Sequence, residues 1–335
     1  MKKCLTVGII LLFVGTCIIP TTAQDIKKLS PSASRGNWLY VGGSGPGNYT
    51  RIQDAVNNAS NGDTIFVYDE MSPYKENVII NKTISLLGEN KSTTIIDGHR
   101  NGCVLTLLAD MVLISNFTIK NAGFHGNDDL AGILIKSSSN LISENIITSD
   151  TQSAYGILLI NSSSNIITSN VIQNNYHAGL EMRYGNDNSI THNLIFNNSH
   201  GSINIGWSSN NVISENHIID YLCLGVLYSF NNVIMKNNFI VHGAALILAD
   251  SGNNTIKQNN FIREWHRIMF FFYNILCVSN KTIQKNHWDS NYWYRQRILP
   301  KPIINHIIID NKRGGFRIEV DWHPAQEPYD IPSMR

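Results

Sequence analysis

The sequence predicts a right-handed parallel β-helix, a solenoid in which short strands wind into stacked rungs. The first observation is a pair of asparagines, five positions apart, that recurs six times between residues 140 and 259. The pairs are Asn140/Asn145, Asn165/Asn170, Asn188/Asn193, Asn211/Asn216, Asn232/Asn237 and Asn254/Asn259. Their second members follow one another after 25, 23, 23, 21 and 22 residues. A period of this length is typical of solenoids, whose units bury their apolar faces only against their neighbours.

The second observation is the pattern of strands inside each repeat. In one repeat, residues 156–160 are followed by the polar turn 161–164 and then by two short apolar runs at 165–168 and 171–172. These runs alternate every second residue, and the absence of a helical pattern excludes a leucine-rich repeat with a helix on one side. Three strands in about 22 residues fit one rung, and rungs stack about 4.8 Å apart. The right-handed rule for crossovers between parallel strands sets the hand.

The third observation is that the asparagines keep their register with isoleucines over all six repeats. This register excludes a low-complexity, disordered chain. Identical residues in successive rungs fall above one another, so we expect the asparagines to form hydrogen-bonded columns, as amide ladders do in other stacked sheets. Such columns supply the partners that buried polar atoms require.

The N-terminal residues 1–23 read as a signal peptide. Lys2 and Lys3 precede an apolar run over residues 5–19, and Ala23 ends a small-residue cleavage site. That run is shorter than the about 20 residues of a membrane-spanning helix. The residues before Cys17 match a lipid-attachment motif poorly. We therefore expect a secreted, extracellular or periplasmic protein without a membrane span after signal removal.

The remaining elements follow in order along the chain. Residues 24–37 form a polar leader, and residues 38–290 form the β-helix of roughly ten rungs. The β-helix includes an N-terminal cap, a helix over residues 50–59 whose apolar face holds Ile52, Ala55, Val56 and Ala59. Residues 291–335 form a C-terminal cap and tail, in which irregular strands over 303–322 cover the last rung.

Charge and cysteines limit the classes of function. The formal net charge of +1 argues against nucleic acid as a partner. Without the signal peptide three cysteines remain, Cys103, Cys223 and Cys277, which do not form a disulfide framework. Nine Asn-x-Ser/Thr sequons, Asn161 among them, would carry glycans if the source organism glycosylates.

Four segments open the predicted β-helix: Tyr49-Thr-Arg-Ile-Gln-Asp-Ala-Val-Asn-Asn-Ala59, Gly62-Asp-Thr-Ile-Phe-Val67, Tyr74-Lys-Glu-Asn-Val78 and Lys82-Thr-Ile-Ser-Leu-Leu-Gly88. They resemble the opening of pectin-lyase-like right-handed β-helix proteins. The repeats that follow resemble the NosD-type family, whose founding members are periplasmic proteins tied to copper-enzyme maturation. The resemblance covers about residues 38 to 290 and implies the fold more firmly than any activity.

One column of residues has the chemistry of a metal site. His177, His200 and Cys223 each stand seven residues after the second asparagine of a pair. Successive rungs would place their side chains about 5 Å apart, and imidazole and thiolate ligands suit Cu or Zn. The alternative is that these side chains only pack or fill the surface.

A second group of residues has the chemistry of a glycan-binding surface. Alternation sends Glu181 and Arg183 outward, Tyr184 follows in the turn, and the next rung places Asn204 and Trp207 beside them. A carboxylate, a guanidinium, an amide and exposed rings suit an extracellular polysaccharide or a surface glycan. The alternative is an ion pair on a solvated face, which stabilises little.

The outward positions contain no pair of carboxylates placed for general acid–base catalysis, since Glu144 and Glu215 are three rungs apart. The pectin-methylesterase run Gly-x-x-Asp-Phe-Ile-Phe-Gly and the epimerase run Asp-Pro-His-Asp are also missing. The first hypothesis is therefore an exported, non-catalytic NosD-like protein with a glycan-binding or structural role. The alternatives are a polysaccharide lyase or hydrolase acting near Glu181, and a copper-associated periplasmic accessory protein.

Overall fold

The computed structural model describes residues 36–123, 129–149, 154–263, 275–279, 285–293, 299–309 and 312–332. These belong to one compact unit, Arg35–Arg335. The predicted signal peptide, Cys17 and nearly all of the predicted polar leader lie outside the described residues. No helix among the described residues is both long and apolar enough to cross a membrane.

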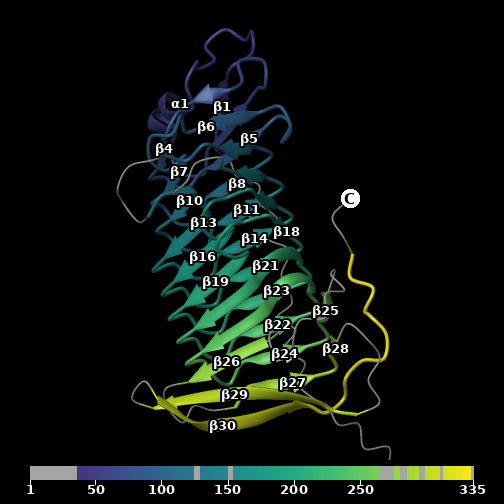
Figure 1. Ribbon diagram of the computed structural model, residues 1–335. Helices are drawn as coiled ribbons and strands as arrows, with labels where there is room; N and C mark the ends of the chain where they lie inside the picture. The colour runs from purple at the N-terminus through teal and green to yellow at the C-terminus, as the bar shows by residue number, and fades with distance from the viewer. Residues whose placement is uncertain are drawn as a thin grey trace, which may run out of the picture. The chain divides into compact units, whose positions relative to one another are not determined.

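The described strands form two sheets that run along a solenoid (Figure 1). The first sheet has 11 parallel strands, one in each rung. They are β1 (Trp38–Val41), β2 (Thr64–Val67), β5 (Ser85–Gly88), β8 (Leu113–Ser115), β11 (Leu141–Ser143), β14 (Ile166–Thr168), β17 (Ser189–Thr191), β20 (Val212–Ser214), β22 (Val233–Met235), β24 (Thr255–Lys257) and β27 (His287–Asp289).

The second sheet has 19 strands, which form two parallel rows and end in β30 (Lys312–Asp321), a strand that pairs antiparallel with β29 (Lys301–Ile309). One row holds β3 (Tyr74–Lys75), β6 (Ile95–Asp97), β9 (Thr118–Lys120), β12 (Ile146–Thr148), β15 (Val171–Gln173), β18 (Leu194–Phe196), β25 (Asn260–Arg263) and β28 (Tyr292–Trp293). The other row holds β4 (Val78–Ile80), β7 (Leu105–Leu107), β10 (Ala131–Ile135), β13 (Tyr155–Ile160), β16 (Leu180–Arg183), β19 (Ile203–Gly206), β26 (Ile275–Ser279) and β29 (Lys301–Ile309). Two long strands, β21 (His217–Leu227) and β23 (Asn238–Ala249), belong to both rows. The predicted β-helix is confirmed.

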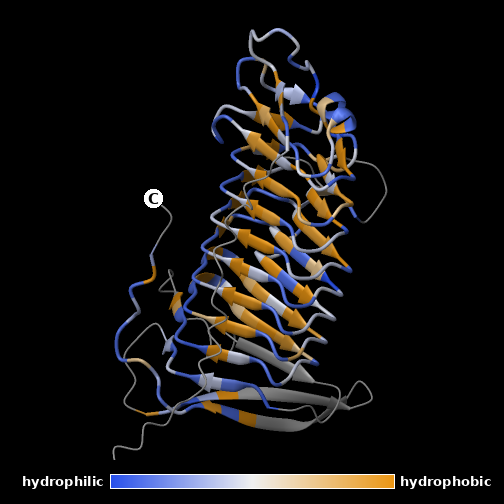
Figure 2. Ribbon diagram, turned by 180° about the vertical axis from the view of Figure 1, so that it is seen from behind, coloured by the Kyte–Doolittle hydropathy of each residue, from blue (hydrophilic) through white to orange (hydrophobic). Residues whose placement is uncertain are grey.

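The core is a set of stacked aliphatic columns. In the first sheet, the middle residue of each three-residue strand points inward, and Ile142, Ile167, Ile190 and Ile213 pair with one another from rung to rung. All four are fully buried. Figure 2 shows the result, hydrophobic strands separated by hydrophilic turns. Each buried isoleucine contributes about 2–3 kcal/mol of hydrophobic stabilisation.

The asparagines form two continuous hydrogen-bonded ladders, as expected. In each step the side-chain Oδ1 accepts the main-chain and side-chain N–H groups of the asparagine one rung earlier. For example, Asn193 Oδ1 lies 3.0 Å from Asn170 N and 3.1 Å from Asn170 Nδ2. Asn193 Nδ2 in turn donates to two main-chain carbonyl oxygens. The ladders therefore satisfy the buried polar groups of the turns.

Both ladders end on carboxylates of the C-terminal strand β30 (Lys312–Asp321). Glu319 accepts the N–H of Asn286 at 3.2 Å, and Asp321 accepts the N–H of Asn291 at 3.0 Å. Both carboxylates are buried. Glu319 also accepts the indole N–H of Trp288, and Asp321 also accepts the indole N–H of Trp293. A carboxylate only accepts hydrogen bonds, so it can end a ladder whose every other member must also donate.

The two ends of the solenoid are covered (Figure 1). At the first rungs lies α1 (Ile52–Asn58), the helix that the sequence predicts, and the Glu76 carboxylate accepts the N–H groups of its first two residues. At the last rungs, β29 and β30 form an antiparallel hairpin, which is more regular than the irregular strands that we predicted. Beyond β30, residues 323–332 run back over earlier rungs, where Tyr329 and Asn260 exchange two hydrogen bonds of 2.8 Å.

Candidate functional site

The structure brings the two histidines of the predicted metal column together. The rings of His177 and His200 lie 5.4 Å apart, and both contact the ring of Tyr176. His177 also stacks on Tyr155 at 4.8 Å, and His200 Nδ1 lies 2.7 Å from the main-chain oxygen of Tyr176. These contacts make a cluster of packed rings at one turn column.

Cys223 does not join the histidines. Its side chain is buried in the core, with Sγ 3.7 Å from the main-chain oxygen of Asp220, and burial raises the pKa of the thiol well above its usual range. The reason is that β21 continues through the position at which His177 and His200 occupy a turn, and a register irregularity between Asp220 and Leu222 interrupts its alternation, so that Cys223 is buried together with Leu224. Across the described parts of the chain, no three His, Cys, Asp or Glu side chains are grouped to hold a metal ion.

The predicted outward residues of β16 form a charged cluster around Arg183. Its Nε lies 3.2 Å from Glu181 Oε1, its Nη1 lies 3.0 Å from Asp129 Oδ1, and its Nη2 donates to the Tyr155 hydroxyl at 2.7 Å. The guanidinium carbon also lies 5.3 Å from the centre of the Tyr155 ring. Arg183 is therefore held by two carboxylates and one aromatic side chain.

The electrostatics of this cluster follow from partial burial. Burial raises the pKa of Glu181. The hydrogen bond and the charge of Arg183, and a hydrogen bond with the Asn204 side chain, act to lower this pKa but do not outweigh burial. For Arg183, burial acts to lower the pKa, but Tyr155 and the two carboxylates outweigh it and the pKa is raised. Arg183 stays charged, and its charge is compensated within the cluster.

Beside the cluster stands a column of three exposed aromatic side chains, which we call the aromatic ladder: Tyr184, Trp207 and Tyr228. Their rings are stacked, with centroids 5.5 Å and 5.2 Å apart and planes 23° and 12° apart. They remain 52%, 52% and 43% exposed. Each residue has a positive φ and directly follows a strand of the second sheet, so each rung presents its ring at the same turn.

The structure thus places all five predicted glycan-site residues on one part of the surface. Glu181 and Asn204 are register partners on adjacent strands, and Tyr184 stacks on Trp207. Sequence reasoning missed Tyr228, although it stands 21 residues after Trp207, one repeat further on. It also missed Asp129, which contacts Arg183 across 54 residues of sequence. No repeat pattern indicates that contact.

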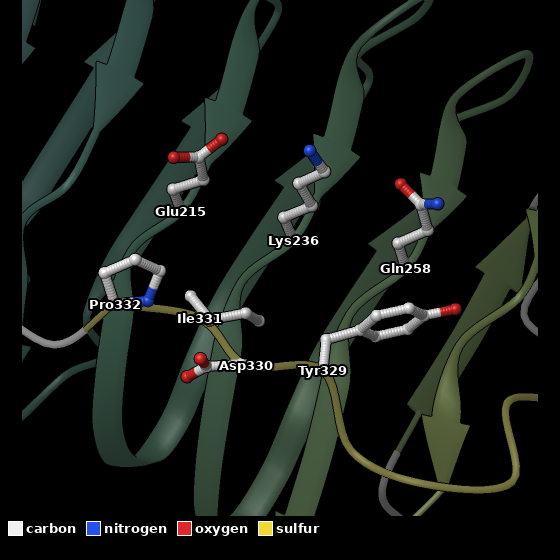
Figure 3. A pocket seen from close by; sticks show the side chains of 7 residues that line it. All are labelled: Glu215, Lys236, Gln258, Tyr329, Asp330, Ile331 and Pro332. Carbon is white, nitrogen blue, oxygen red and sulfur yellow. The ribbon is translucent and has the colours of Figure 1, made fainter.

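A separate small cavity, of about 210 Å³, lies beneath the C-terminal tail (Figure 3). On one side are Glu215, Lys236 and Gln258, which project from three successive rungs, and on the other side is the tail segment 329–332. The cavity is below the range of about 300–1,000 Å³ that is usual for small-molecule sites. The outer surface at the aromatic ladder is therefore the stronger candidate.

Comparison with known proteins supports the architecture. A profile described as the right handed beta helix region matches residues 21–218 and 131–291. The chain belongs to the right-handed β-helix family. Within it, a segment of 89 residues is 37% identical to the probable pectinesterase/pectinesterase inhibitor 6 of Arabidopsis thaliana. The match covers 24% of this β-helix protein and 16% of that relative, so the chain spans only about a sixth of the length of the Arabidopsis protein.

Solved structures share the fold at low sequence identity. XylC in complex with xylose superimposes with a TM-score of 0.54 at 10% identity, over 83% of this chain and 73% of that chain. The enzymatically active domain of bacteriophage CBA120 tailspike protein 2 superimposes with a TM-score of 0.53 at 15% identity, over 75% of this chain and 40% of that chain. These structural matches show that the chain shares the β-helix fold with both proteins.

Proposed function

We propose that this protein is an exported, non-catalytic, NosD-like β-helix protein that binds glycans on its outer surface, at the aromatic ladder and the adjoining Arg183 cluster. The observation that carries the proposal is the exposure of three stacked rings in successive rungs. Exposed apolar surface that is continuous across several residues marks an interaction site. Export rests on the signal-peptide pattern of residues 1–23.

The side chains around the ladder suit a sugar ligand. Tyrosine and tryptophan rings offer an apolar face together with a polar edge, and sugars carry both C–H faces and hydroxyl groups. Glu181 and Asn204 add a carboxylate and an amide three residues before Tyr184 and Trp207, respectively. XylC, which has the same fold, was solved with xylose, so the fold can hold a sugar.

The Arg183 cluster favours binding over catalysis. Hydrolysis of a glycosidic bond uses two carboxyl groups on opposite sides of that bond, one as acid and one as base or nucleophile. Here Glu181 and Asp129 both bind the same guanidinium, which occupies the space between them. The rival function is a polysaccharide lyase or hydrolase, which is favoured by the raised pKa of Glu181, a property of general acids.

The experiment that tests the proposal is a binding and turnover screen of the purified protein against neutral and acidic polysaccharides. We expect retention on at least one polysaccharide without any release of reducing ends or unsaturated products. Trp207→Ala should strongly reduce retention and leave the circular dichroism spectrum unchanged. Cleavage that disappears in Glu181→Gln would instead establish the enzyme, and a correctly folded protein that binds no glycan would refute the proposal.

A further inference from the structure

The aromatic ladder has a direction and a period. Its three rings follow one another along the solenoid axis, one per rung, at 5.5 Å and 5.2 Å. The rung spacing of about 4.8 Å sets this repeat. A ligand that contacts all three rings must therefore repeat at nearly the same distance. Extended chains of β-1,4-linked pyranoses advance by about the length of one sugar ring per unit, whereas α-1,4-linked chains coil.

The rings overlap only in part. Stacked carbon atoms in contact lie about 3.5–4.0 Å apart, and the ring centroids are more than 5 Å apart although their planes are nearly parallel. Neighbouring rings therefore do not cover one another completely, and part of each ring stays open to solvent, in agreement with exposures of 43–52%. Each uncovered face can take the C–H face of one sugar unit.

The charges around the ladder disfavour an acidic chain. Arg183 is bound to Glu181 and Asp129, so it offers no uncompensated charge to a uronate. Lys136 occupies the outward column of Arg183 two rungs earlier. Among these described residues, the two cations Arg183 and Lys136 are balanced by the two carboxylates of Glu181 and Asp129, so an anionic ligand would gain no net electrostatic attraction here.

From these observations, and resting on the proposed function, we infer the class of ligand. The ligand is a neutral, extended, β-linked polysaccharide that lies parallel to the solenoid axis, with one sugar unit on each of Tyr184, Trp207 and Tyr228. Hydroxyl groups on the strand side of the chain reach Glu181 and Asn204, which precede the first two rings by three residues.

Gly206 offers a way to block this path without disturbing the fold. It occupies the outward column between Arg183 and Leu227, directly before Trp207. A Cβ added there would meet no atom closer than the main-chain oxygen of Met182 at 3.8 Å, which is ordinary contact. Gly206→Val is therefore expected to fold normally, because valine suits a strand, and to place a branched side chain beside the central ring of the ladder.

The test is calorimetric titration with purified oligosaccharides of two to six units: β-1,4-linked glucose, xylose and mannose, α-1,4-linked glucose, and galacturonate. We expect affinity for one β-linked neutral series to rise until three units are reached, then to level off, and to be independent of salt. Trp207→Ala should weaken binding about 30-fold and Gly206→Val about tenfold, whereas Tyr221→Ala, at a 72% exposed tyrosine outside the ladder, should change nothing.

The outcomes separate this inference from the proposed function. Tighter binding of galacturonate, with affinity that falls as salt rises, would overturn the inference and leave glycan binding intact. Glycan binding that is unaffected by both Trp207→Ala and Gly206→Val would also overturn it. A folded protein that binds none of these series, nor the polysaccharides of the screen above, would refute the proposed function itself.

Discussion

Replacing Asp220 by asparagine should stabilise the protein at neutral pH. Asp220 is buried, and it ends a third, shorter ladder: its Oδ1 lies 3.1 Å from Asn198 N, just as Asn198 Oδ1 lies 3.1 Å from Asn175 N. Ser202 donates its hydroxyl to the second carboxylate oxygen. An asparagine keeps the acceptor for Asn198, and its amide group can donate to the Ser202 hydroxyl oxygen, so the substitution matches the rest of the ladder.

The magnitude follows from the pKa of Asp220. Burial raises this pKa from 3.8 to about 6, although hydrogen bonds from Ser202 and Asn198 and the charge of His242 oppose the rise. Between about pH 4 and pH 6 the unfolded chain is ionised while the native carboxyl group keeps its proton. Native stability therefore falls as pH rises through this window, by up to about 3 kcal/mol at pH 7. An asparagine does not titrate and avoids this loss.

The assay is urea unfolding of the wild type and Asp220→Asn at pH 4, 5, 6 and 7. We expect the difference in free energy of unfolding to grow from near zero at pH 4 to about 2–3 kcal/mol in favour of the variant at pH 7. Asp187→Asn, at an exposed turn position, serves as the matched control and should leave the pH dependence unchanged. A variant that is less stable at pH 7, with the pH dependence of the wild type, would refute the reasoning.

Two further predictions concern the ladders and the tail. Asn193→Ala removes a buried acceptor of two N–H groups and should lower the free energy of unfolding by about 3 kcal/mol, as measured by urea denaturation. Asn57→Ala, at an exposed position of α1 whose side chain pairs with Gln53, should change it by less than about 0.5 kcal/mol. His217 accepts a hydrogen bond from Asn238 at 2.6 Å. Burial lowers the pKa of His217, although a hydrogen bond with the main chain of Ile331 in the tail acts to raise it. Because protonation removes that acceptor and charges a partly buried ring, the contribution of His217 to stability should be complete above about pH 6.5 and be lost as pH falls through the lowered pKa. The free energy of unfolding of the wild type relative to His217→Gln should therefore fall from pH 7 to pH 5, and a difference that stays constant over this range would contradict this.

Much of the site could be predicted because a solenoid places residues of one period side by side. The asparagine ladders and the contact between Tyr184 and Trp207 each join residues one repeat apart. The same rule would have found Tyr228. The prediction for Cys223 was wrong where the rung changes its shape, since β21 replaces a turn by continuous strand. Spacing locates a residue along the rung, but the local backbone decides whether its side chain points inward.

The sequence by itself determined the fold class, the hydrogen-bonded columns and the face that carries the exposed rings. These depend on contacts between neighbouring repeats, which a constant period encodes. Only the tertiary structure decided the contacts that span several repeats or leave the repeat altogether. Asp129 neutralises Arg183 from 54 residues away, and Glu319 and Asp321 of an antiparallel hairpin close both ladders. No period relates these partners, because their approach depends on how the connecting segments and the C-terminal hairpin pack against the completed solenoid.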